Sequence, residues 1–244
     1  TAGVYLVTRS AELYVLVPAA QTWVTWVGAV TALFAATIAV GQFDIKKVLA
    51  YSTISQMGFM LLGLTPTVVS GNTLSAANGY SSSMFYVLTY VFTTLGTFGI
   101  VMLLSRAGHE AEQVDDLKGL AKRSPWYAAV MAIFMFSLAG IPPTVGFYAK
   151  LAILQALVTT NVPGYITLAI VAVALSLIGA YYYLRIIKVM YFDAPVAGVP
   201  AIEARSQGIS AVLALNGGAV LVLGLLPGGL MALCRDAILK ALAS

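Results

Sequence analysis

The sequence predicts an all-α polytopic membrane protein with about six transmembrane helices plus a partial one, one of the six being broken. Of its 244 residues, 60% are hydrophobic and only 9% are charged, whereas a soluble domain carries about 25% charged residues. The apolar runs reach the roughly 20 residues that span a bilayer. They form unbroken blocks instead of the alternation typical of barrel strands, so helices are expected.

The first part of the chain contains a partial span and three complete ones. Residues 1–8 resemble the end of a helix that begins upstream, so the chain is expected to be the C-terminal part of a larger fold. Complete spans are expected at 21–42, 48–64 and 83–104. A charged connection separates the first two, and an uncharged turn with proline, glycine and asparagine separates the second from the third.

The stretch 106–123 is the most polar part of the chain, with four acidic and four basic residues. Within it, Val114, Leu117 and Leu120 are spaced three apart, which predicts a short amphipathic helix. Such a helix would lie on the membrane surface. We therefore expect a cytoplasmic amphipathic loop inside a single transmembrane domain that covers residues 1–244.

The broken span is expected at 125–158, where helix-breaking residues interrupt an apolar run. The breakers are Gly140, Pro142, Pro143 and Gly146. A span at 165–192 follows, and the last span, at 209–233, contains Pro227 and is expected to be bent.

Lysine and arginine are distributed unevenly between the two sides of the predicted topology. If the broken span crosses once, nine of these residues fall on one side and three on the other. The positive-inside rule makes the rich side cytoplasmic. The C-terminus is then expected to face outward.

Lys150 is the candidate functional residue, because no other charged residue lies between Arg123 and Arg185. It follows the break and lies about 12 Å, or eight residues, before the far end of its helix. Ionisable residues inside membranes usually serve ion or proton transfer, so Lys150 is expected to carry protons. The alternative is a lysine that snorkels to the outer headgroups.

The break itself has two interpretations, a packing kink alone or a kink that also lines a proton path. Pro142 and Pro143 remove backbone donors and leave upstream carbonyls without partners. In the second interpretation, those carbonyls line the path with Ser137, Thr144 and Tyr148.

Two tyrosines of the preceding span, Tyr86 and Tyr90, have helical spacing and are further candidates for lining a water path. Other polar residues in the spans are expected to make interhelical hydrogen bonds. The tyrosines of 180–185 are expected to form an aromatic belt at the membrane interface.

Lys46 and Lys47 open the span at 48–64. They are interpreted first as cytoplasmic anchors beside the headgroups, with proton uptake as the weaker alternative. Asp44, just before them, is typical of the acidic residue at a helix N-terminus.

The composition argues against several functional classes. One cysteine and one histidine cannot supply the ligands of an iron–sulfur cluster or a bis-histidine haem. The expected cofactor and metal content of this chain is therefore none. The net charge of +4 reflects basic residues beside spans, so no nucleic-acid partner is expected.

Four stretches of the chain carry a family resemblance, and they lie within 72–193. They read SLAGIPPTVGFYAK, SAANGYSSSMFYV, DDLKGLAKRSPW and GAYYYLRIIKVMYF. They resemble the N-type antiporter-like membrane subunit of bacterial respiratory complex I, the proton-pumping NADH:quinone oxidoreductase. DIKKVLAYSTISQ is shared by several antiporter-like subunits, and roughly the first sixty residues look more like the L-type subunit.

The resemblance implies a fold with two inverted five-helix repeats, of which this chain would hold the second. It implies that Lys150, which matches the lysine after the second break, is a proton-channel residue. It also implies that NADH, FMN, iron–sulfur clusters and quinone bind in partner subunits. The expected surroundings are other membrane subunits of complex I and the bilayer of the bacterial inner membrane, with the C-terminus in the periplasm.

Three functions follow as hypotheses. The first is a proton-translocating subunit of NADH:quinone oxidoreductase, an enzyme whose redox centres lie in other chains. The second is a subunit of a multi-subunit Na⁺/H⁺ antiporter of the same superfamily. The third is a structural membrane module that conducts nothing.

Overall fold

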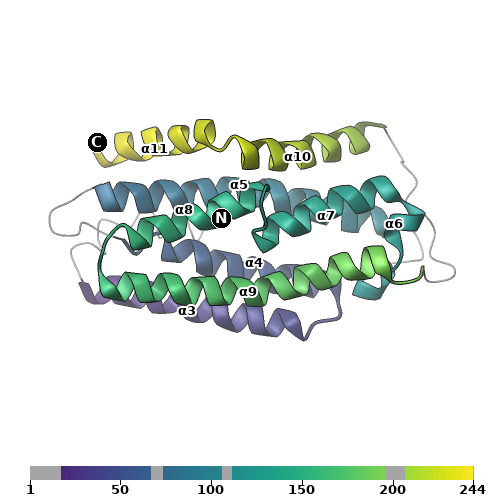
Figure 1. The fold of residues 1–244 in the computed structure, drawn as a ribbon, viewed down its shortest axis with the longest axis horizontal. Coiled ribbons are helices and arrows are strands. Elements are labelled where there is room, and N and C mark those ends of the chain that lie inside the picture. The colour runs from purple at the N-terminus through teal and green to yellow at the C-terminus, as the bar shows by residue number, and fades with distance from the viewer. Residues whose placement is uncertain (1–17, 67–73, 106–111, 196–206, 244) are drawn as a thin grey trace.

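The protein is described by a computed structural model in which residues 18–66, 74–105, 112–195 and 207–243 are placed. The longer helices, in chain order, are α3 (Pro18–Val40), α4 (Ile45–Leu62), α5 (Leu74–Leu104), α7 (Pro125–Ala139), α8 (Val145–Val158), α9 (Pro163–Phe192), α10 (Gln207–Leu225) and α11 (Gly228–Ala243). They run along one direction as a bundle, with α3 and α9 at one side and α10 and α11 at the other (Figure 1). The partial helix expected at 1–8 lies outside the described residues.

The all-α polytopic membrane fold is confirmed. Helices long and apolar enough to cross a membrane are found at Thr22–Val40, Asn78–Leu104, Pro163–Phe192 and Gly208–Leu225. The 18-residue α4 also approaches spanning length, about 27 Å. The shorter α7 and α8 follow one another along the bundle (Figure 1). They lie in series, as a broken segment that crosses once requires.

Helix α5 begins nine residues before the predicted span at 83–104, so the predicted boundary was wrong. Polar residues such as Ser81 and Ser82 precede position 83 and lower the hydropathy there. In the structure, the hydroxyls of Ser81 and Ser82 donate to the carbonyl of Asn78, at 3.1 and 2.7 Å. Serines that bond to the preceding turn satisfy their own polar groups, and the helix therefore extends through them.

The last span, predicted as one bent helix at 209–233, is instead two helices, α10 and α11, that meet at Leu226 and Pro227. Pro227 has no N–H to continue the helical ladder. A Cβ on Gly224 would lie 2.1 Å from the carbonyl oxygen of Pro143. The end of α10 therefore lies directly against the loop that connects α7 and α8.

The polar stretch 106–123, described here from residue 112, does not form the predicted surface helix. It contains a short 3-10 turn, Val114–Leu117, and one turn of α-helix, α6 (Leu120–Arg123). Val114 and Leu117 are at most 3% exposed, because they pack into the core instead of against a membrane surface. Backbone hydrogen bonds join residue 114 to the α3–α4 turn and residue 119 to the end of α9.

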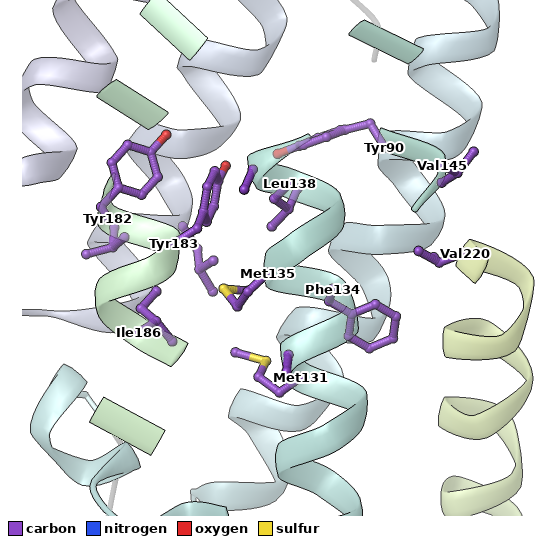
Figure 2. Packing of buried hydrophobic residues seen from close by; sticks show 14 of the residues in the cluster. Tyr90, Met131, Phe134, Met135, Leu138, Val145, Tyr182, Tyr183, Ile186 and Val220 are labelled. Atoms are coloured by element: carbon purple, nitrogen blue, oxygen red, sulfur yellow. The ribbon is translucent and has the colours of Figure 1, made fainter. Parts of the chain in front are cut away.

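The core is centred on α7, whose side chains are buried on several sides. Figure 2 shows Met135 and Leu138 directed toward Tyr183 of α9, while Phe134 points toward Val220 of α10. A helix that is apolar all round is expected in such a position. The end of α7, where the helix breaks, is therefore enclosed by neighbours.

Candidate functional site

Helix α7 ends at the break, and its last backbone carbonyls are therefore available to donors outside the helix. Gly140 has φ of 82°, the left-handed conformation that commonly ends helices. The backbone N–H groups of Gly140 and Ile141 both donate hydrogen bonds to the carbonyl oxygen of Phe136. The carbonyls of Leu138 and Ala139, with no following helical turn, point to the region where α8 begins.

Lys150 fills that region. Its Nζ donates to the carbonyl oxygen of Leu138 at 3.1 Å, to that of Ala139 at 3.0 Å and to the Oγ of Ser176 on α9 at 2.9 Å. The residue is 9% exposed. An ammonium has three donors, so all three are satisfied.

The direction of the lysine side chain follows from helix geometry. Side chains of a helix lean toward its N-terminus, which for α8 is the break. Lys150 therefore reaches back to α7, and a Cβ on Gly140 would lie 2.8 Å from its Cδ. The alternative, a lysine snorkelling toward the outer headgroups, is not the conformation observed.

Among the described residues, oriented dipoles and the aromatic ring of Phe59 surround the ammonium of Lys150. The C-terminal end of a helix carries partial negative charge, and here it belongs to α7. The ring of Phe59 on α4 lies 5.9 Å from Nζ, within the range of a cation–π contact. Among the described residues, no carboxylate pairs with this ammonium.

Gln56 of α4 connects the break to a buried tyrosine group. Its Nε2 donates to the same Leu138 carbonyl at 3.1 Å and to the hydroxyl of Tyr183 at 3.0 Å. Its Oε1 accepts from Tyr86, and Tyr183 also bonds to Ser52. One carbonyl oxygen is thus shared by Lys150 and a polar network across α4, α5 and α9.

A small cavity lies beside this network. It measures about 20 Å³, and Gln56, Tyr86, Tyr90 and Ser137 are among the residues that line it. A cavity of that size with several polar partners holds about one water molecule. Ser137 also accepts from the N–H of Gly146 at 3.2 Å and lies 3.3 Å from the Thr93 hydroxyl.

The other predicted lining residues lie elsewhere. Pro142, Pro143 and Tyr148 are exposed, the last by 39%. Thr144 is buried, but its hydroxyl bonds the carbonyl of Ile141 within the loop, at 2.7 Å. The structure brings Ser137, Tyr86 and Tyr90 together with the network and leaves these four out of it.

The predicted aromatic belt at 180–185 was wrong for two of its three tyrosines. Tyr182 and Tyr183 are buried, at 2% and 0% exposure, and only Tyr181 is exposed. Successive residues of a helix point about 100° apart, so one of three tyrosines faces outward. Gln56 and Ser176 appear in the sequence only as two of the polar residues within spans. For Gln56, the spacing of four from Ser52 was a signal that both share a face.

Lys46 and Lys47 are exposed at the opposite end of α4 from the uncharged turn, outside the buried network. Asp44 caps the helix, because its Oδ1 accepts from their backbone N–H groups at 2.8 and 3.1 Å. Lys47 Nζ lies 3.7 Å from Asp44 Oδ2. This geometry supports the interpretation of Asp44 as an N-terminal acid.

Asp44→Ala is expected to destabilise the protein by about 1 kcal/mol, the usual cost of losing a helix N-cap. Asp44→Asn, which can cap equally well, should melt as the original protein does. The measurement is the melting temperature of the purified protein in detergent. Equal melting of all three proteins would show that the cap contributes nothing.

The chain is similar to known membrane proteins. A family model described as NADH:quinone oxidoreductase/Mrp antiporter, TM, matches residues 1–179. The chain is 55% identical over 227 residues to NADH-quinone oxidoreductase subunit N of Herminiimonas arsenicoxydans, covering 91% of this chain and 45% of that protein. It therefore spans just under half the length of this curated relative. That match covers most of the first sixty residues, the part that looked more like the L-type subunit.

Two solved structures have a similar fold. A chain of respiratory complex I from Thermus thermophilus with bound aureothin is 26% identical, with a TM-score of 0.71 over 86% of this chain and 45% of that one. A chain of the Mrp complex from a Dietzia species has the same TM-score at 24% identity, covering 88% of this chain and 46% of that one. The second likeness concerns the fold alone.

Proposed function

This chain belongs to the family of NADH:quinone oxidoreductase and Mrp antiporter transmembrane subunits, and we propose that it translocates protons in an NADH:quinone oxidoreductase. Quinone reduction elsewhere in the complex drives the movement, and Lys150 carries the proton. The observation that carries the proposal is the ammonium of Lys150, buried at the break and held only by uncharged oxygens of the described residues.

Reversible protonation requires the charged and neutral states of Lys150 to be close in free energy. Burying an ammonium costs several kcal/mol. Hydrogen bonds to a charged group contribute about 1.5–3 kcal/mol each, and three are present. The two effects are of the same order. A carboxylate partner would stabilise the charged state of Lys150. No carboxylate is among the described contacts of Lys150, which supports a lysine that exchanges its proton.

The route to the carrier is proposed to pass through the polar network. Gln56, Tyr86 and Tyr90 line a cavity large enough for one water. Gln56 shares the Leu138 carbonyl with Lys150. Changes in hydration at this cavity would therefore alter the surroundings of the lysine directly.

In the complex, the chain is proposed to act as a subunit of the translocating enzyme without a redox centre of its own. One cysteine and one histidine in the whole sequence support that assignment. NADH, FMN, iron–sulfur clusters and quinone are assigned to partner subunits. The partners are other membrane subunits of complex I and the lipid of the bacterial inner membrane, with the C-terminus in the periplasm.

Subunits of Na⁺/H⁺ antiporters are the second candidate, because the family model covers both groups. Co-purification separates them. NADH dehydrogenase activity is expected to co-purify with a tagged form of the full-length subunit. Na⁺-dependent proton exchange in vesicles, without NADH dehydrogenase activity in the purified complex, would instead establish the antiporter.

A further inference from the structure

The hydroxyl of Ser176 differs in kind from the other two groups that hold Lys150. Ser176 lies near the middle of α9, half-buried, and its Oγ is 2.9 Å from Nζ. The other two partners are backbone carbonyl oxygens. Among the described residues, Ser176 forms a hydrogen bond only with Lys150, and in that bond its oxygen is the acceptor. The hydroxyl proton of Ser176 is therefore not donated to another described group.

The three partners respond differently when Lys150 loses its proton. A neutral amine has two N–H donors and one lone pair, and a carbonyl oxygen can only accept. A hydroxyl can both accept and donate, and its proton rotates to suit the partner. Ser176 is therefore the contact that can accept from the ammonium and, after rotation, donate to the lone pair of the amine.

Without that reversal, the lone pair of the neutral amine would face acceptors only. A buried acceptor without a donor costs about 1–3 kcal/mol, which would drive the side chain away from the break or keep it protonated. We propose that Ser176 is the positioning residue that keeps the Lys150 nitrogen at the break in both protonation states. This inference rests on the proposed function, since it concerns how the carrier is held as the proton comes and goes.

Threonine and valine at position 176 provide a test, because they have nearly the same shape and only threonine has the hydroxyl. Ser176→Thr, Ser176→Val and Ser176→Ala are introduced into the full-length subunit of the assembled complex, which is reconstituted in liposomes. Proton uptake driven by NADH oxidation is then measured. We expect Ser176→Thr to pump within about twofold of the original complex. The valine and alanine variants should pump at least about tenfold more slowly, since one hydrogen bond to a charged group contributes about 1.5–3 kcal/mol.

Ser55→Ala is the matched control, since its hydroxyl also makes an interhelical bond, to the Ala32 carbonyl at 3.0 Å, away from Lys150. It should pump normally. Equal pumping by the threonine and valine variants would overturn the inference, because shape alone would then matter. If neither the threonine nor the valine variant assembles into the complex, the smaller alanine variant provides the test. Normal pumping by the alanine variant would overturn the inference.

Lys150→Ala in the same experiment separates the two proposals. If it abolishes pumping while Ser176→Val and Ser176→Ala pump normally, only the role of Ser176 fails. If Lys150→Ala pumps normally, the proposed carrier is wrong, and the role of Ser176 fails with it.

Discussion

Lys150→Met is expected to reduce proton pumping by the assembled complex at least tenfold while leaving the bundle folded. Methionine fills a similar volume and adapts to irregular gaps, but it cannot take up a proton. The substitution also removes the cost of burying an ammonium. The Leu138 carbonyl keeps its hydrogen bond from Gln56. The measurement is NADH-driven acidification of liposomes, normalised to the amount of assembled complex.

Lys47→Met is the control for that experiment. The Lys47 side chain is 65% exposed and pairs with Asp44 at the surface. Surface pairs contribute about 0–1 kcal/mol, so both assembly and pumping should stay near normal. Normal pumping by Lys150→Met would disprove the carrier role. Lost pumping by Lys47→Met in an intact complex would restore the alternative of proton uptake at this end of α4.

Gly146→Ala is expected to have the largest effect on the structure. A Cβ at this position would lie 1.8 Å from the carbonyl oxygen of Ser137 and 2.7 Å from its carbonyl carbon. These are backbone atoms, so the break must open to relieve the clash. Overpacking typically costs about 1–3 kcal/mol, and this clash belongs at the upper end. Opening would also carry Lys150 away from the carbonyls of Leu138 and Ala139.

Gly218→Ala is the matched control, because nothing lies within 4 Å of a Cβ there and the residue is inside helix α10. Alanine is favoured over glycine in helices by about 0.8–1 kcal/mol, so this variant should be as stable as the original or slightly more so. Melting temperature and the yield of assembled complex are the two readouts. Equal melting of both variants would contradict the close approach of α7 and α8.

Much of the fold was predictable because its determinants are local. Long apolar runs predict helices of spanning length, and Gly140, Pro142 and Pro143 predict the break, since a proline removes a backbone donor wherever it lies. The placement of Lys150 past the break follows from counting residues along the helix. For the second interruption, at Pro227, the sequence predicted a bend within one helix. That it separates α10 from α11 was not predicted.

The partners of Lys150 could not be predicted in the same way. Helix α7 is apolar on every side, so periodicity does not indicate which face meets α9 and which meets α10. The burial of Tyr183 and the roles of Gln56 and Ser176 depend on how α4, α8 and α9 pack around the end of α7. Contacts between residues 26 to 131 positions apart carry no local signal.

The amino-acid sequence alone determined the membrane class, the broken helix and the presence of one lysine beside the break, because these depend on composition and on backbone chemistry within a few residues. The tertiary structure alone decided which groups hold that lysine. Its side chain turns back to the carbonyls of Leu138 and Ala139 and to Ser176. A buried ammonium must find acceptors, and packing decides which acceptors lie within reach.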